Sequence, residues 1–153
     1  MVEWAAAHQH TTATPDGTGY RLNGHKVWVA NGEVADLLLV FATTEPGIGG
    51  RGVSAFLLPS ETVGVRAETT ADSLGVRGLG CRDIDLDEVR VGADAMLGAA
   101  GDGFRIAMWA LDGGRVAIAA QALGIGQAAF DEALAHAKRR QTFGRPSSRR
   151  RGC

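Results

Sequence analysis

The sequence predicts an α+β chain, in which an antiparallel β-domain of the barrel-like or sandwich kind is followed by long α-helices. Short apolar runs separated by turn residues recur through the first ninety residues, which is typical of strands. From Gly103 onward, apolar residues recur at steps of three and four, which indicates helix. With 45% hydrophobic and 22% charged residues among 153, the composition is that of a globular chain.

The first predicted strands flank Asn23-Gly24, a pair that favours a tight β-hairpin. Tyr20–Leu22 and Lys26–Val29 would be its two arms, so we expect the chain to turn at Asn23-Gly24. Further strands are expected at residues 36–43, 52–59, 63–67 and 82–86.

The helical pattern runs from Gly103 to about Ala137. Gly113-Gly114 is a local weakness, because each glycine costs about 1 kcal/mol relative to alanine in a helix interior. A break or kink is expected there. Residues 147–153 have no apolar periodicity and predict a disordered tail.

Gly47, Gly49 and Gly52 have the spacing G-x-G-x-x-G, which also occurs in dinucleotide-binding folds. That function requires a strand before the glycines and a helix after them, whose N-terminus holds the pyrophosphate. The segment that follows, VSAFLLP, is too short and too rich in strand-forming residues for such a helix. The pattern therefore predicts a glycine-rich connection between two antiparallel strands.

The formal net charge of -1 gives no field that would attract the chain to nucleic acid or to an anionic membrane, so neither is an expected partner. Cys81 and Cys153 have no metal-ligand spacing and cannot form a disulfide framework, which predicts no metal site and favours the cytoplasm. The N-terminus has an acid where a signal peptide needs positive charge.

Five segments, in order, resemble the acyl-CoA dehydrogenase family: YRLNGHKVWVANGEVADLLLVFA, GVSAFLLP, SLGVRGLGCRDIDLDEVRV, GDGFRIAMWALDGGRVAIAAQALG and KRRQTFGRP. The resemblance covers about residues 11–146. It implies a middle β-domain over residues 1–100, of which 1–10 are unmatched. Residues 101–146 would then be the first helices of the C-terminal domain, an incomplete helical bundle, and residues 147–153 a disordered tail. It also implies a chain truncated at both ends.

The resemblance implies a flavoprotein of fatty acid metabolism, an oxidoreductase that carries out FAD-dependent α,β-dehydrogenation of an acyl-CoA thioester. The expected partners are that thioester and further copies of the chain, or a related subunit. We expect little activity from this chain alone, because the family's usual catalytic glutamate lies later in the helical domain. Some members carry it directly before the arginine of an L-D-x-x-R motif, where this chain has Gly114. No catalytic residue is therefore predicted. A non-catalytic oligomerisation or ligand-binding module that keeps the fold remains an alternative.

For the cofactor, the resemblance places Trp28, Val29 and Ala30 against the isoalloxazine ring. A large flat indole excludes water where a hydride must travel. The alternative is an ordinary core tryptophan on a strand. Ala30 replaces the family's usual threonine or serine and offers only its backbone amide, a loss of about 1 kcal/mol for one hydrogen bond.

In the family, the R-x-x-F-G motif reaches across a subunit interface to the partner's FAD pyrophosphate. Arg140, Gln141, Thr142 and Phe143 match it. An arginine fork suits phosphate oxygens because it donates paired, charge-assisted hydrogen bonds. A basic helix C-terminus is the alternative interpretation, and both can hold at once.

For the substrate, the resemblance assigns Asp112 and Arg115 to the CoA thioester end. They are three residues apart, so a surface ion pair on a helix, worth about 0.3 kcal/mol, is the alternative. The acids of the later strand pattern are predicted to form a solvated face rather than to be catalytic: Asp83, Asp85, Asp87 and Glu88.

Overall fold

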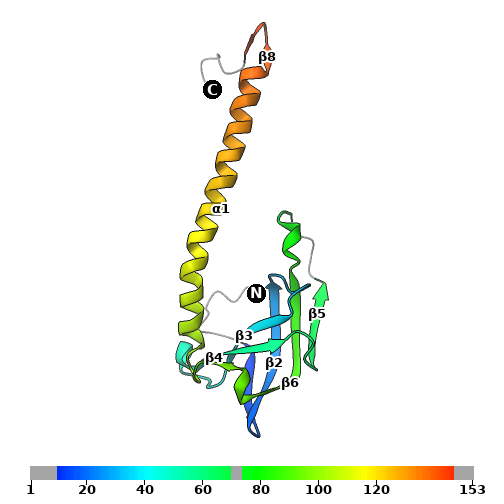
Figure 1. The fold of residues 1–153 in the computed structure, drawn as a ribbon, viewed down its shortest axis with the longest axis vertical. Coiled ribbons are helices and arrows are strands. Elements are labelled where there is room, and N and C mark those ends of the chain that lie inside the picture. Colours follow the sequence, from blue (N-terminus) through cyan, green and yellow to red (C-terminus); the bar gives the residue numbers. More distant parts are fainter. Residues whose placement is uncertain (1–9, 70–73, 147–153) are drawn as a thin grey trace. The chain divides into compact units, whose positions relative to one another are not determined.

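The computed structural model describes residues 10–69 and 74–146, and the predicted tail at 147–153 lies outside them. The chain divides into two compact units, Met1–Met108 and Trp109–Cys153. The strands of the first unit are β1 Thr12–Asp16, β2 Gly19–Val29, β3 Leu37–Thr43, β4 Val53–Pro59, β5 Val65–Thr69, β6 Arg82–Gly92 and β7 Met96–Leu97. Short 3-10 turns are η1 Gly49–Gly52, η2 Arg77–Leu79 and η3 Ala93–Ala95. Helix α1 spans Gly103–Arg139, and β8 Gln141–Thr142 and β9 Arg145–Pro146 follow it (Figure 1).

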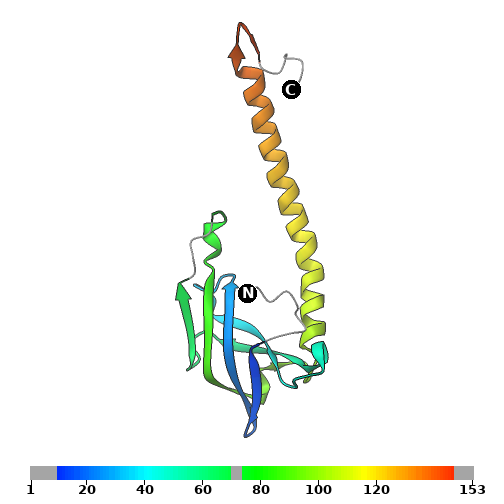
Figure 2. The ribbon, with the colours of Figure 1, turned by 180° about the vertical axis from the view of Figure 1, so that it is seen from behind.

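The seven strands form one sheet in the order β5-β6-β2-β1-β3-β4-β7. Its pairings are antiparallel except for β1 and β3, which are parallel and joined at Thr12 and Thr43. The ribbons of β3 and β4 cross those of β2 and β6 at a steep angle (Figures 1 and 2). The α+β prediction is confirmed, and the sheet is mixed and open rather than closed into a barrel, because β5 and β7 remain unpaired edges.

The core lies between the two halves of this folded sheet. Its buried residues come from both halves: Ala13, Leu22, Leu38, Val40, Ala42, Phe56, Leu58, Ile84, Leu86 and Val89. The ring of Tyr20 packs edge-on against Phe56, with centroids 5.3 Å apart. Full burial of a side chain such as Phe56 or Leu58 contributes about 1.5–3 kcal/mol, so this unit carries its own source of stability.

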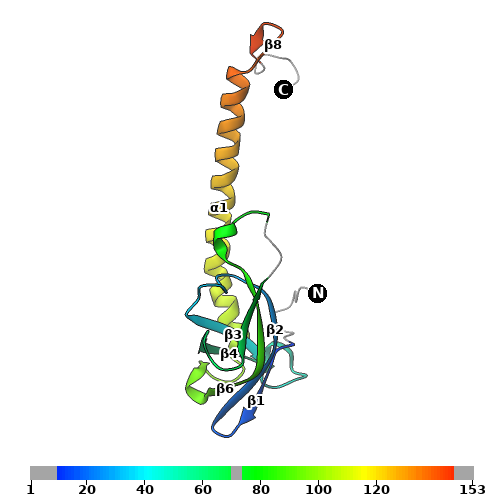
Figure 3. The same cartoon turned by 90° about the vertical axis from the view of Figure 1, so that its right-hand side faces the viewer.

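The predicted turn at Asn23-Gly24 is wrong, because β2 runs straight through both residues. The hairpin lies earlier, where Asp16 pairs with Gly19 and Gly17 has a positive φ of 63° (Figure 3). Asn23-Gly24 instead forms a register shift opposite β6. The Asn23 amide accepts the Glu88 backbone N–H at 2.8 Å and donates to the Glu88 carboxylate at 2.7 Å. These long-range contacts favour a bulge over a turn.

Helix α1 is continuous through Gly113-Gly114, so the expected break is wrong. A Cβ added at either glycine would meet no atom within 4 Å. Propagation of an existing helix therefore outweighs the cost of the two glycines. The prediction of helix from Gly103 to about Ala137 is confirmed.

The first turn of α1 is attached to the sheet within the first unit. The buried Ser54 hydroxyl of β4 accepts the N–H of Gly101 at 3.0 Å and bonds the Thr44 hydroxyl at 2.8 Å. A Cβ on Gly103 would lie 2.6 Å from the Ser54 carbonyl carbon, so only glycine permits this close approach. Among the described residues, no helix combines the length and apolar character needed to cross a membrane.

Candidate functional site

Trp28 lies at the end of β2 with its indole half exposed, at 49% accessibility. Its backbone is left-handed, with φ 55°, which is rare for a bulky residue. Its N–H donates to the Asp83 carboxylate of β6 at 2.8 Å. The core-tryptophan alternative therefore does not describe Trp28.

The segment after Trp28 is tied to the chain that leads into β6. The N–H of Asn31 donates to Leu79 O at 2.9 Å, and the N–H of Glu33 donates to Gly80 O at 3.1 Å. The Glu33 carboxylate also pairs with Arg82 at 2.7 Å. Val29 packs against the core and Ala30 is exposed, so the three predicted flavin-contacting positions lie together on a fixed backbone.

Asp112 and Arg115 form an ion pair at 3.2 Å on α1, and their side chains are 76% and 66% accessible. Gly114 lies beside them. The pair has the i,i+3 geometry expected of helix neighbours. The geometry agrees with the surface ion pair, and a substrate role for these residues stays a prediction.

Arg140 follows the last residue of α1, and its N–H donates to His136 O at 2.8 Å. The chain then turns back in a two-residue hairpin between β8 and β9. Phe143 and Gly144 occupy the turn with φ of 52° and 72°, and the Phe143 ring is almost fully exposed. Two positive φ values in succession are typical of a type I′ turn. This hairpin was not among the predicted elements, although a glycine at Gly144 before a short strand is a recognised turn signal.

In the second unit, the predicted substrate-binding residues lie far along the chain from the predicted FAD-binding residues. Arg115 and Arg140 are 25 positions apart, which at 1.5 Å per helical residue corresponds to roughly 37 Å. One copy of this unit therefore cannot bring Arg115 and Arg140 to a single small site.

The glycine loop is a connection between the antiparallel strands β3 and β4, as predicted. It closes as the 3-10 turn η1, and the N–H groups of Thr44 and Glu45 both donate to Gly52 O. A Cβ on Gly52 would lie 1.9 Å from Glu45 O, so the glycine serves a close backbone approach. Strand β4, rather than an α-helix, follows these glycines.

Two surface hollows of the first unit were not predicted. One, of about 510 Å³, lies between η1 and the start of α1 and is lined by Ile48, Gly50, Arg51, Gly101, Asp102, Phe104 and Arg105. Hydrogen bonds from the Ala99 N–H and from Arg105 hold the pKa of Asp102 below its ordinary value. Gly50 and Gly101, which line this hollow, were its only signal in the sequence.

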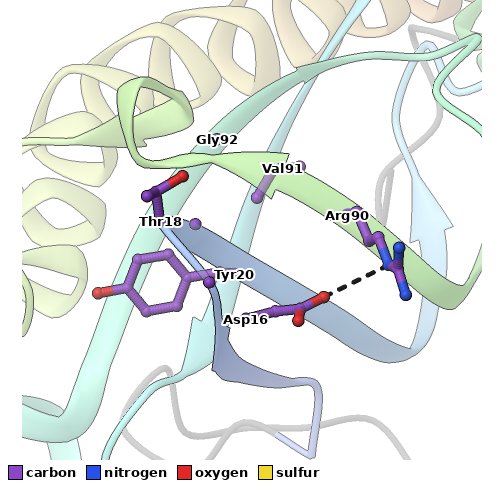
Figure 4. Close-up of a pocket in the computed structure, with 8 residues that line it drawn as sticks. Asp16, Thr18, Tyr20, Arg90, Val91 and Gly92 are labelled. Carbon is purple, nitrogen blue, oxygen red and sulfur yellow. Dashed lines mark ion pairs between the residues drawn. The ribbon is translucent and has the colours of Figure 1, made fainter.

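The other hollow, of about 420 Å³, lies at the β1–β2 hairpin, beside the end of β6 (Figure 4). Asp16 pairs there with Arg90 at 3.3 Å and with Arg21 at 2.9 Å. The Arg21 hydrogen bond, followed by the Arg21 and Arg90 charges, keeps the pKa of Asp16 below its ordinary value. Within residues 10–69 and 74–146, no group of three His, Cys, Asp or Glu side chains is placed to hold a metal ion.

Two family models match the chain, "Acyl-CoA dehydrogenase, middle domain" over residues 4–89 and "Acyl-CoA dehydrogenase, C-terminal domain" over residues 101–152. The short-chain specific acyl-CoA dehydrogenase of Megasphaera elsdenii is 42% identical over 142 residues, covering 92% of this chain and 37% of that protein. The human mitochondrial short-chain specific enzyme is 43% identical over 136 residues, covering 89% of this chain and 33% of that protein.

Among solved structures, butyryl-CoA dehydrogenase from Megasphaera elsdenii superposes with a TM-score of 0.90 at 38% identity, covering 97% of this chain and 40% of that one. The chain therefore spans well under half the length of the relatives it matches.

Proposed function

We propose, because this chain belongs to the acyl-CoA dehydrogenase family, that its β-domain contacts the isoalloxazine ring of FAD through Trp28 in the family's dehydrogenation of an acyl-CoA thioester. The observation that carries the proposal is the half-exposed Trp28 indole on a backbone fixed by hydrogen bonds. A flat apolar ring presented at a fixed place fits the flat ring of a flavin. FAD supplies the acceptor for the hydride that leaves the substrate's β-carbon.

In this proposal Trp28 excludes water from one side of the reacting centre. Val29 anchors the segment in the core, and the exposed Ala30 presents its backbone amide toward the flavin. Because alanine lacks a hydroxyl, the flavin receives one hydrogen bond fewer than in members with threonine or serine at this position.

Asp112 and Arg115 bind the thioester end of the substrate, and Arg140, Gln141, Thr142 and Phe143 bind an FAD pyrophosphate. The separation of roughly 37 Å between Arg115 and Arg140 along the helix supports a division of labour between copies of the chain. The proposal therefore includes a homo-oligomer in which Arg140 serves the FAD of a neighbouring copy.

The domain limits expected from the sequence, 1–100 and 101–146, belong to the same proposal. They are supported by the two family models. The match to the middle-domain model ends at residue 89, and the match to the C-terminal-domain model begins at residue 101. Fatty acid metabolism and a cytoplasmic location also stay proposals. The location is supported by the two cysteines alone.

A non-catalytic oligomerisation module is the second candidate, because the large apolar side chains of α1 from Trp109 to Phe130 are exposed in the single chain. Light scattering across a range of protein concentrations tests for self-association. An assembling chain that binds no FAD would favour this candidate over the flavoprotein.

The proposed function is tested by titrating FAD into the purified chain and recording the visible absorption spectrum. We expect Trp28→Ala to weaken FAD binding about tenfold and Val63→Ala, which shortens an exposed side chain of the same unit, to leave it unchanged. Absence of FAD binding by the unsubstituted chain, or equal losses in both variants, contradicts the proposal. Anaerobic addition of butyryl-CoA should bleach the bound flavin little, since no catalytic acid is predicted.

A further inference from the structure

We infer that Asp83 is a positioning residue, whose carboxylate holds the backbone bulge that keeps Trp28 on the outer side of the sheet. The inference rests on the proposed contact between Trp28 and the flavin. It assigns a role to a side chain that the sequence pattern predicted to be only part of a solvated face.

The register between β2 and β6 shifts between Lys26 and Val29. Lys26 pairs with Ile84, and Val29 pairs with Arg82. Two residues of β2, Val27 and Trp28, therefore stand opposite the single residue Asp83. This two-against-one arrangement is a β-bulge, a feature that redirects side chains.

The bulge leaves the backbone N–H of Trp28 to bond a side chain rather than a backbone carbonyl of β6. A bulge disrupts the backbone ladder, and the Trp28 N–H is taken by the Asp83 side chain at 2.8 Å. An ionised carboxylate makes a stronger acceptor than a neutral carbonyl. Trp28 has a left-handed backbone, a conformation that persists only when its surroundings fix it, and this hydrogen bond is made by its own N–H.

The bulge also changes the face of the sheet on which the Trp28 side chain lies. On β2, Gly24 and Lys26 stand opposite Leu86 and Ile84, which belong to the core. In a regular strand, residue 28 would follow on that same face, because side chains alternate with period two. Instead Val29 packs against the core and Trp28 is half exposed. The bulge thus exchanges the places of the indole and the valine.

The neighbouring carboxylates have other partners. Asp85 pairs with His25, and Asp87 pairs with Arg66 at 3.2 Å. Both stand on β6 at alternate positions from Asp83, so they share its face of the strand. Asp87→Ala is therefore a matched control, which removes a carboxylate of the same strand without touching the Trp28 amide.

The inference is tested first on the FAD-free chain. Asp83→Ala and Asp83→Val both remove the acceptor, and valine favours a strand, so the sheet is retained. We expect hydrogen exchange of the Trp28 amide to accelerate about tenfold in both variants. With Trp4 and Trp109 replaced by phenylalanine, acrylamide should quench Trp28 emission less strongly, because residue 28 then returns to the core side of the strand. Asp83→Asn, which keeps an oxygen acceptor, and Asp87→Ala should behave like the unsubstituted chain.

FAD titration of the same variants completes the test. We expect Asp83→Ala and Asp83→Val to bind FAD about five- to tenfold more weakly, with Asp83→Asn close to the unsubstituted chain. Unchanged exchange and quenching overturn the inference even when FAD binds normally. Altered exchange with unchanged FAD affinity also overturns it, because Asp83 then serves only the fold. If the unsubstituted chain binds no FAD, the proposed function fails and the flavin role of Asp83 fails with it, whereas the exchange data still decide whether Asp83 holds the bulge.

Discussion

The β-domain and the helix use their apolar residues in opposite ways. In the first unit, Phe56 and Leu22 are completely buried by side chains of the same unit. In α1, Val116, Leu123 and Phe130 are all more than half exposed, and Gly103 is the single buried residue among the described residues of the helix. The sheet buries the apolar residues of its own strands, whereas the apolar residues of α1 stay exposed in the single chain.

The distribution of residues around α1 explains the contrast. Trp109, Val116, Leu123 and Phe130 recur every seven residues along one side, and Leu111, Ile118 and Ile125 recur in the same way along a side turned by about 200°. No charged residue lies between Arg115 and Asp131. A helix that is apolar on more than one side is typical of an element surrounded by others.

The largest expected difference is between two phenylalanines. Phe56→Ala should lower the free energy of unfolding by about 3–5 kcal/mol, because it opens a cavity in a closed core. Phe130→Ala, at a ring that is 61% exposed, should change it by less than about 0.5 kcal/mol. Urea unfolding followed by circular dichroism measures both.

The same pair of variants can break the comparison. A similar loss for Phe130→Ala at every protein concentration would mean that α1 packs within its own chain. A loss that appears only at high concentration would instead support the proposed homo-oligomer, since association contributes to stability by mass action.

Two glycines should respond with opposite signs. Gly52→Ala places a Cβ 1.9 Å from Glu45 O, so the loop must shift, at a cost of about 1–3 kcal/mol. At Gly124 of α1 a Cβ meets nothing within 4 Å, and alanine should add up to about 1 kcal/mol of helix stability. Thermal unfolding of the two variants measures the difference, and stabilisation by Gly52→Ala would show that the close approach in the loop is not needed.

Glycines also mark what the sequence could and could not predict. The strands and the helix followed from local apolar periodicity, and their positions are largely confirmed. The turn predicted at Asn23-Gly24 was wrong because the conformation there depends on Glu88, a residue 65 positions away that hydrogen-bonds Asn23. Such long-range pairing is invisible in a local pattern, and the same holds for the bulge at Trp28.

For the candidate site, only the family resemblance predicted that Trp28 contacts a flavin rather than packing as an ordinary core tryptophan. Periodicity alone would have placed residue 28 in the core, on the side of Lys26 and Gly24. The exposure of the indole depends on Asp83, whose own pattern predicted a solvated face. The physical reason is again a single side-chain contact between distant strands.

A smaller effect is expected at the His25–Asp85 pair on the outer face of the sheet. The Asp85 hydrogen bond raises the pKa of His25, with further help from the charges of Asp83 and Glu68, while Arg66 lies near Asp85 and acts on its charge. The contribution of His25 is complete below its ordinary pKa of 6.5 and is lost as the pH rises through the raised folded value.

The Asp85 carboxyl has a lowered pKa, so its contribution is present above the ordinary value of 3.8 and is lost as the pH falls through the lowered folded value. Stability should therefore be greatest between these limits, by about 0.2–1 kcal/mol for an exposed pair. Asp85→Asn should lower the His25 pKa toward 6.5 in an NMR titration of the imidazole. An unchanged His25 titration would mean that the two side chains do not pair in solution.

The smallest stability effect is expected at Asp112 and Arg115, and this is what makes the pair informative. Arg115→Ala should change the free energy of unfolding by only about 0.3 kcal/mol, because the ion pair is exposed on both sides. The control is Asp131→Ala, which removes a comparable exposed contact, the 2.9 Å hydrogen bond from Gln127. If Arg115 serves the fold alone, the two variants should be alike in every measurement. If Arg115 binds the substrate, calorimetry should show butyryl-CoA binding at least about tenfold weaker in Arg115→Ala and unchanged in Asp131→Ala. A large loss of butyryl-CoA affinity with almost no loss of stability would mean that this exposed surface of α1 binds a ligand rather than stabilising the chain.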